Sequence, residues 1–259
     1  MNKVMSLEEI CGIIRPADGK IMDEVWKRWD NKCIPLRSLG WLQESLVRIA
    51  GVQESIRPEI GRKLTFVMAA DNGVVDEGVS QSDYHVTTQV VKNMMHHKAT
   101  IMLMSEQADS DVLVVDMGMK EKVEGVLDMS LMRGTANMAA GPAMRRETAV
   151  KAIEAGAFLA MQKAGEGYRL FATGEMGIGN TTSSSAVLAV LSGEPVSVVT
   201  GRGAGLSGEG LERKIKTVEK AIHVNKPDPS DPLDVLSKVG GLDIAGLTGV
   251  FLGAAAAKV

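Results

Sequence analysis

Hydrophobic residues recur with two different periods along this chain, and the period changes near residue 60. Residues 6 to about 55 carry apolar positions three and four apart, which is the spacing of helices that bury one face. Pro35 interrupts this pattern, because proline cannot continue a helix. Beyond residue 60, short apolar runs rich in β-branched residues alternate with longer helical patterns. Four of these runs are predicted to be buried strands: residues 64–70, 111–116, 169–173 and 195–200.

Strands that alternate with helices are typical of a parallel sheet, because the crossover helices cover both of its faces. We therefore expect an α/β fold: a doubly wound, mostly parallel sheet with helices on both faces and a small helical N-terminal layer. Residues 226–232 contain three prolines and predict an exposed connection, after which helical spacing resumes at residue 233.

A glycine-rich segment follows the third predicted strand. Residues 174–182 read GEMGIGNTT and lead into a helical pattern over residues 183–191. Glycines let the backbone approach a ligand closely, and Asn180, Thr181 or Thr182 can cap the helix. The free amides at a helix start favour an anion, so the segment predicts a phosphate site. A glycine-rich turn without a ligand is the alternative interpretation.

A second glycine-rich turn, residues 201–205, follows the run 195–200 and precedes a helical pattern that begins near Ser207. Loops that follow neighbouring parallel strands can grip one nucleotide from two sides. Most charges of the following helix are expected to form a solvated face, but one of its lysines, Lys214, Lys216 or Lys220, can reach back to a phosphate. Neither turn spells the P-loop or the dinucleotide-binding pattern. We predict a helical subdomain over residues 1–60 and an α/β nucleotide-binding domain over residues 61–259.

These turns belong to a longer series of short motifs that resembles, in the same order and almost end to end, the nicotinate-nucleotide–dimethylbenzimidazole phosphoribosyltransferase family. The further motifs are SLG at residues 38–40, AADNGV at 69–74, EGVS at 77–80, DMG at 116–118, GTAN at 134–137, GPAM at 141–144, ERKI at 212–215, DPL at 231–233 and GGLDIA at 240–245. Each motif alone is weak, whereas the ordered series is specific.

The resemblance implies an enzyme that moves phosphoribose from nicotinate mononucleotide to an aromatic lower-ligand base of a cobamide and releases nicotinate. It implies no metal and no redox cofactor, and it implies a homodimer. It also assigns the substrate-binding residues. The phosphate is expected at Gly177, Gly179, Asn180 and Lys214, and the incoming base at Ser80, Ser82, Tyr84, Gln89 and Met176. Thr181 and Gly203 are further substrate-binding residues. The thioether of Met176 can lie against an aromatic ring, although an ordinary core methionine is the alternative.

Some positions depart from the family pattern. Asn72 stands where the family has histidine and Tyr84 where it has glutamine, so the accepted base is left open among benzimidazoles, purines and phenols. The family's general-base glutamate lies in a C-terminal segment that has no counterpart before Val259. A truncated fragment, a second chain that supplies the segment, and a non-catalytic nucleotide-binding subunit remain open as explanations. Glu175 is the candidate for a supporting or substitute catalytic carboxylate. The chain alone is expected to bind nicotinate mononucleotide weakly and to react slowly.

Composition narrows the class of protein further. The net charge of −3 and the pI near 5.9 give no reason to expect nucleic acid as a partner. The 2 cysteines suit a reducing compartment, and the 4 histidines lack metal-site spacing. The N-terminus does not resemble a signal peptide, and no apolar run reaches the ~20 residues of a membrane span. We therefore expect a cytoplasmic protein without a membrane partner.

Overall fold

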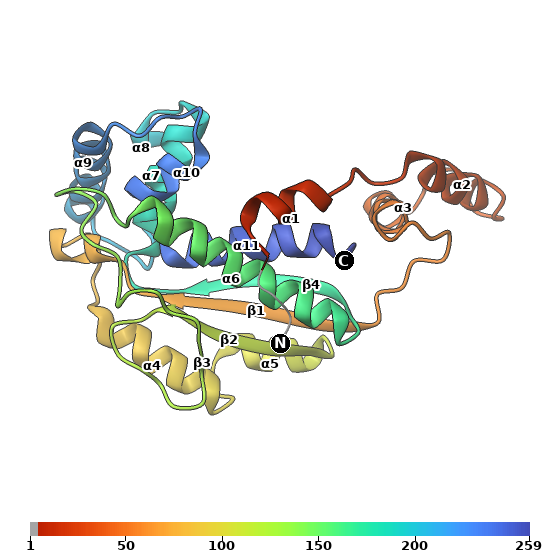
Figure 1. The fold of residues 1–259 in the computed structure, drawn as a ribbon, viewed down its shortest axis with the longest axis horizontal. Helices are drawn as coiled ribbons and strands as arrows, with labels where there is room; N and C mark the ends of the chain where they lie inside the picture. The colour runs from red at the N-terminus through yellow and green to blue at the C-terminus, as the bar shows by residue number, and fades with distance from the viewer. Residues whose placement is uncertain (1–4) are drawn as a thin grey trace.

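The centre of the molecule is a parallel sheet, seen in a computed structural model that describes residues 5–259 (Figure 1). The strands lie in the order β3-β2-β1-β4, and every neighbouring pair is parallel. Their bounds are β1 (Arg62–Ala70), β2 (Ser110–Gly118), β3 (Leu127–Asp128) and β4 (Tyr168–Met176). Three of the four predicted strands are thereby confirmed as β1, β2 and β4, but residues 169–173 are not buried, because β4 lies at the edge of the sheet. The two-residue β3 was not predicted, because it is too short to show a pattern.

The fourth predicted strand is wrong. Residues 195–200 form the short helix α8 (Val196–Val199), which begins after Pro195. A continuous apolar run of this length is compatible with a strand or a helical turn, and tertiary packing decides between them. Val196 packs in a helical cluster away from the sheet, and Val198 is 69% exposed, so the run is not a buried strand. The second glycine-rich turn therefore follows a helix.

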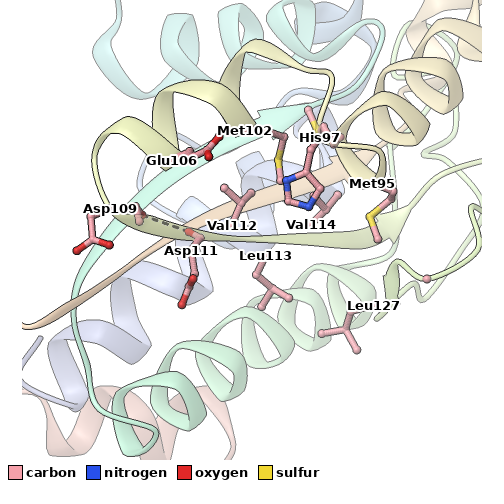
Figure 2. A pocket seen from close by; sticks show the side chains of 13 residues that line it. Met95, His97, Met102, Glu106, Asp109, Asp111, Val112, Leu113, Val114 and Leu127 are labelled. Atoms are coloured by element: carbon pink, nitrogen blue, oxygen red, sulfur yellow. Dashed lines mark hydrogen bonds between the residues drawn. The ribbon is translucent and has the colours of Figure 1, made fainter.

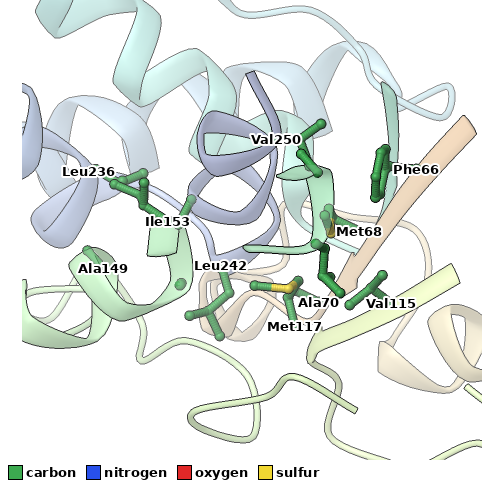
Figure 3. Packing of buried hydrophobic residues seen from close by; sticks show 14 of the residues in the cluster. Phe66, Met68, Ala70, Val115, Met117, Ala149, Ile153, Leu236, Leu242 and Val250 are labelled. Atoms are coloured by element: carbon green, nitrogen blue, oxygen red, sulfur yellow. The ribbon is translucent and has the colours of Figure 1, made fainter. Parts of the chain in front are cut away.

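Helices cover both faces of the sheet, as expected. One face packs against α4 (Tyr84–Met95) and α5 (Thr100–Gln107), and the other packs against α6 (Arg146–Gly165) and α11 (Leu242–Ala256). The side chains of β1 alternate between the two cores. Phe66 and Met68 point towards α6 and α11 (Figure 3), whereas Val67 and Ala69 belong to the core beneath α4 and α5. Burial on both faces explains why the strand reads as a continuous apolar run.

A further group of helices lies beyond the carboxyl ends of the strands (Figure 1). It comprises α7 (Asn180–Ser192), α8, α9 (Gly208–Asn225) and α10 (Pro232–Val239), together with the 3₁₀ turn η1 (Gly73–Glu77). These elements share a hydrophobic cluster that includes Val74, Ala186, Val218 and Val235. Ser207 caps α9 by accepting a hydrogen bond from the amide of Gly210, which confirms the predicted start of that helix.

Three helices precede the sheet: α1 (Leu7–Ile13), α2 (Gly19–Asp30) and α3 (Trp41–Gln53). Pro35 lies between the last two, as the sequence predicts. α2 and α3 pack on each other around Val25 and Val47 and project from the body of the molecule (Figure 1). α1 instead packs on α11 and α6, and the amide of Leu7 donates to Glu154. The division into domains at residue 60 stays a proposal.

Candidate active site

The strand order creates a switch point between β1 and β4. The chain leaves β1 towards β2 and β3 and later returns to the other side of β1 as β4. In open parallel sheets, ligands bind at such a switch point, outside the carboxyl ends of the strands. At this point the backbone of Gly177 lies against the carbonyl oxygen of Ala70, and a Cβ at position 177 would overlap that oxygen. Glycine at this position lets the loops that follow β1 and β4 meet.

A pocket of about 380 Å³ lies beside these loops. Both glycine-rich turns border it, although the second follows a helix rather than a strand. The pocket is therefore the candidate site for one nucleotide. Its lining comprises Val79, Ser80, Gln81, Met176, Gly177, Ile178, Gly179, Asn180, Thr181, Thr182, Arg202, Gly203, Ala204, Leu206 and Lys214.

Lys214 projects into the wall of this pocket from α9. The residue is only 1% exposed, and its ammonium donates to Thr181 Oγ1 at 2.7 Å and to the carbonyl of Gly201 at 3.2 Å. Both partners are neutral, and within residues 5–259 no carboxylate lies at ion-pair distance. Burial lowers the pKa of this lysine. A buried cation without a counter-ion is costly, so the site is electrostatically prepared for an anion.

In the first glycine-rich turn, fewer backbone amides are free to bind an anion than expected. The amide of Ile178 donates to Thr87 Oγ1, and the amide of Asn180 donates to the carbonyl of Gly177. The amides of Gly177 and Gly179 have no acceptor among residues 5–259 and can serve a ligand. The expectation that Asn180, Thr181 or Thr182 caps α7 is wrong, because Gly179 is the N-cap with a φ of 91°. Positive charge in the lining comes from Lys214 and from Arg202, whose guanidinium donates to the carbonyl of Leu206.

The predicted substrate-binding residues divide into two groups. Those that line the pocket are Ser80, Met176, Gly177, Gly179, Asn180, Thr181, Gly203 and Lys214. Those outside its lining are Ser82, Tyr84, Gln89 and the predicted catalytic residue Glu175. Glu175 is exposed at the end of β4 and accepts a hydrogen bond from the side chain of Asn180, so it lies next to the lining. Gln89 is exposed on α4, and the amide of Ser82 donates to Ser80 Oγ.

Tyr84, the first residue of α4, has an unpredicted neighbour. The ammonium of Lys120 lies 3.2 Å from the centroid of its ring, and the tyrosine hydroxyl bonds to Asp76. A cation therefore covers one face of the ring, where it is attracted to the π electrons. One turn further along α4, Thr87 accepts a hydrogen bond from the amide of Ile178 in the pocket wall. The start of α4 is thus tied to the candidate site.

Two buried polar residues near the pocket are not among the predicted site residues. Asn72 and Asp243 are both completely buried, the first after β1 and the second in the first turn of α11. The pKa of Asp243 is raised to about 7, mainly by burial, and the charges of Glu175 and Asp71 contribute to this rise. A sequence signal was present, because Asp243 interrupts the apolar stretch at the start of α11.

A larger cavity lies elsewhere, at the outer edge of β2 (Figure 2). Its volume is about 860 Å³, and Met95, Met102 and Val114 supply part of its apolar wall. None of the predicted site residues lines it. Glu106, Asp109 and Asp111 contribute three carboxylates, a charge that repels phosphate, so this cavity is not a candidate nucleotide site. Asp111 is engaged by Arg62 and Tyr168.

Comparison with known proteins identifies the family. A family model described as a phosphoribosyltransferase matches residues 14–259. The nicotinate-nucleotide–dimethylbenzimidazole phosphoribosyltransferase of Geobacter metallireducens is 46% identical over 98% of this chain and 72% of its own length. The chain belongs to the nicotinate-nucleotide–dimethylbenzimidazole phosphoribosyltransferase family. The protein of that name from Ruminiclostridium cellulolyticum is 44% identical over 98% of this chain and 73% of its own length.

A solved structure confirms the fold. CobT from Thermus thermophilus superposes with a TM-score of 0.87 at 39% identity, and the match covers 93% of this chain and 73% of that one. Membership of the family confirms the resemblance, the α/β fold and the transferase class expected from the sequence. Of the helices within residues 5–259, none has the length and apolar character needed to cross a bilayer.

Proposed function

We propose that this chain transfers phosphoribose from nicotinate mononucleotide to a dimethylbenzimidazole-like base and releases nicotinate. The observation that carries the proposal is the buried ammonium of Lys214, which has no counter-ion among residues 5–259 and lies in a pocket bordered by both glycine-rich turns. The family relatives are named for this reaction. A phosphate held by Lys214 and the Gly177 and Gly179 amides would fix the ribose, which supplies the positioning that such a displacement needs.

The reaction breaks the bond between C1 of the ribose and the pyridinium nitrogen of nicotinate. The bonding electron pair returns to that nitrogen and neutralises it, while a nitrogen lone pair of the acceptor base forms the new bond to C1. Positive charge develops on the ribose, and the acceptor then loses its ring proton to a base. Glu175 stands at the pocket edge, where a carboxylate can stabilise that positive charge or take the proton.

The test combines binding with product analysis. Nicotinate mononucleotide is titrated into the protein by calorimetry, and the protein is then incubated with this nucleotide and dimethylbenzimidazole while nicotinate and the new nucleotide are separated by chromatography. We expect a binding isotherm and equal amounts of the two products. Absence of binding at millimolar nucleotide would refute the proposed site, and hydrolysis to ribose 5-phosphate without a new nucleotide would refute the proposed transfer.

Glu175→Gln is expected to reduce the rate of nicotinate release by about 10-fold or more, because the variant keeps the shape but removes the charge and the proton acceptor. The affinity for nicotinate mononucleotide is expected to change little. Steady-state rates and calorimetry measure the two effects. Glu194→Gln removes another exposed glutamate, beyond the end of α7, and serves as the control. Unchanged rates in both variants would exclude Glu175 from the chemistry.

Tyr84→Gln is expected to change the preference among acceptor bases. The substitution removes the ring on which Lys120 rests and the hydroxyl that bonds to Asp76, so the wall beside the pocket is rebuilt. We expect the ratio of kcat/KM for dimethylbenzimidazole to that for adenine to change at least about threefold, as one altered apolar contact is worth ~1 kcal/mol or more. Tyr168→Phe, at the opposite end of the sheet, is the control. An identical ratio in the wild type and Tyr84→Gln would remove Tyr84 from base selection.

The proposal also covers the cellular compartment and the oligomeric state of the enzyme. Cys11 and Cys33 are both exposed and unpaired, which suits a reducing compartment such as the cytoplasm. We also propose a homodimer. The exposed Trp41 and Leu42 of α3 support an apolar contact surface on the projecting hairpin, and sedimentation analysis distinguishes monomer from dimer.

A further inference from the structure

A carboxyl group lies buried beneath the candidate site. Asp243 is 0% exposed in the first turn of α11. Its Oδ1 accepts a hydrogen bond from the amide of Ile244 at 2.9 Å, whereas its Oδ2 is buried and has no partner among residues 5–259. A buried carboxyl without a cation is expected to be neutral, and a group of this kind beside a ligand pocket is a candidate functional residue.

Asn72 connects Asp243 to the phosphate loop. A Cβ on Gly241 would overlap Asp243 Oδ1 and crowd Asn72 Oδ1, so both side chains converge on the Gly241 backbone. On its other side Asn72 lies under the loop: its Nδ2 would be 3.4 Å from a Cβ on Gly177, and its own Cβ would be 3.1 Å from one on Gly179. The Nδ2 group is buried and has no acceptor in the described part of the chain.

Asn72 also contacts the helix that follows the loop, because its Oδ1 accepts a hydrogen bond from Ser183 Oγ in α7 at 3.1 Å. A single buried amide therefore lies between the Asp243 carboxyl and the glycines whose amides are free for an anion. A displacement of the Asn72 side chain by Asp243 is therefore expected to displace these glycines as well, since close-packed interiors transmit strain.

The charges around Asp243 are mostly negative. Asp71 follows β1 and Glu175 ends β4, and both charges disfavour the ionised form of Asp243. Asp71 in turn faces Asp116 of β2 and the cation of Lys120. The side chain that α7 contributes is the uncharged Ser183. On the pocket side, the lining contains two cations, Lys214 of α9 and Arg202. A dianionic ligand bound at Lys214 would add more negative charge to this group.

We propose that Asp243 is a positioning residue of the site: as a neutral acid it holds Asn72, and through Asn72 the loop at residues 177–179, in the arrangement that binds a dianionic phosphate. Loss of the Asp243 proton places a charge beside the Asn72 amide oxygen, close to Asp71 and Glu175, and weakens anion binding. The inference rests on the phosphate site of the proposed function. By linkage, an anion that binds better to the protonated form must raise the Asp243 pKa by the same factor.

The first experiment measures sulfate affinity at about pH 6 and about pH 8.5, because sulfate keeps its charge over this range and phosphate does not. The wild type and Asp243→Asn are expected to bind equally at the lower pH. At the higher pH the wild type is expected to bind about tenfold more weakly than the variant, as one extra charge near a dianion costs at least ~1.4 kcal/mol. Titration of Lys214 weakens binding at high pH in both proteins and cancels in the comparison.

Asp234→Asn is the matched control, because Asp234 lies on α10 and is paired with Lys238. This control is expected to follow the wild type at both pH values. A purely structural role of Asp243 would shift affinity equally at both pH values, and that result would overturn the proposal. So would identical affinities of the wild type and Asp243→Asn at the higher pH.

The second experiment needs no folded variant. Carbon-13 spectra of aspartate carboxyls in the wild type are recorded against pH with and without sulfate. The carboxyl that titrates near neutrality is expected to shift its midpoint upward by about one unit when sulfate binds, which is the reciprocal of the tenfold effect. A midpoint that does not move while sulfate binds overturns the inference and leaves the proposed function intact. If the wild type binds neither sulfate nor nicotinate mononucleotide, the inference and the proposed function are both overturned.

Discussion

Lys214→Met is expected to weaken binding of nicotinate mononucleotide by about 10²-fold. The variant keeps the length and apolar stem of the side chain but removes the ammonium that the pocket wall holds against Thr181 and Gly201. A hydrogen bond to a charged group contributes roughly 1.5–3 kcal/mol, and the upper part of that range corresponds to about 10²-fold in affinity. Calorimetric titration with the nucleotide measures the effect.

The same substitution is expected to leave stability unchanged or to increase it. Lys214 is a buried cation without a counter-ion in the described part of the chain, and its folded-state pKa is lowered by burial, so its charge disfavours folding. Opposite changes in affinity and stability separate loss of a ligand contact from loss of structure. Lys216→Met, on the exposed face of the same helix, is the control and is expected to affect neither quantity. Wild-type affinity in Lys214→Met would rule out this lysine as the phosphate ligand.

The fold was predictable where local pattern and tertiary packing agree. β1 and the carboxyl-terminal half of β2 are buried on both faces, so each reads as an apolar run between helical patterns. β4 is an edge strand in which only Tyr168 is buried, and its run was recognisable from its position before the glycine-rich segment. Residues 195–200 show a similar apolar run, but Val196 packs among helices. No local feature of the sequence indicates that this run forms a helix rather than a strand. β3 pairs over only Leu127 and Asp128, and its pairing depends on β2 rather than on a pattern of its own.

The candidate site was predictable where one segment carries the chemistry. The first glycine-rich turn follows β4 at the carboxyl edge of the sheet, which is where ligands bind in parallel sheets. The second turn and Lys214 reach the same pocket from α8 and α9. Contacts between distant segments were not predictable. Lys120 covers Tyr84 from a different loop, and Asp243 meets Asn72 from more than a hundred residues away. Such neighbours depend on how the elements pack, which the resemblance to a family does not specify.

Asp243→Asn is expected to be more stable than the wild type at neutral and alkaline pH. The pKa of Asp243 is raised from 3.8 to about 7, mainly by burial, so between these values the folded protein binds a proton that the unfolded chain does not. The stability that this proton contributes is present in full below about pH 4 and is lost as the pH rises through about 7. A difference of roughly three pKa units corresponds to about 4 kcal/mol, at ~1.36 kcal/mol per unit.

Urea unfolding between about pH 4 and pH 8 measures this difference. The wild type and Asp243→Asn are expected to be similar at the acid end, and the variant is expected to gain up to about 4 kcal/mol over the wild type above pH 7. Asp234→Asn should behave in the opposite way, because Lys238 lowers the pKa of Asp234 and its charge therefore stabilises the fold above the unfolded-state pKa. That variant should be less stable than the wild type at neutral pH. Parallel stability curves for the wild type and Asp243→Asn would mean that Asp243 is already ionised in the folded protein, which would remove the neutral acid from beneath the phosphate loop.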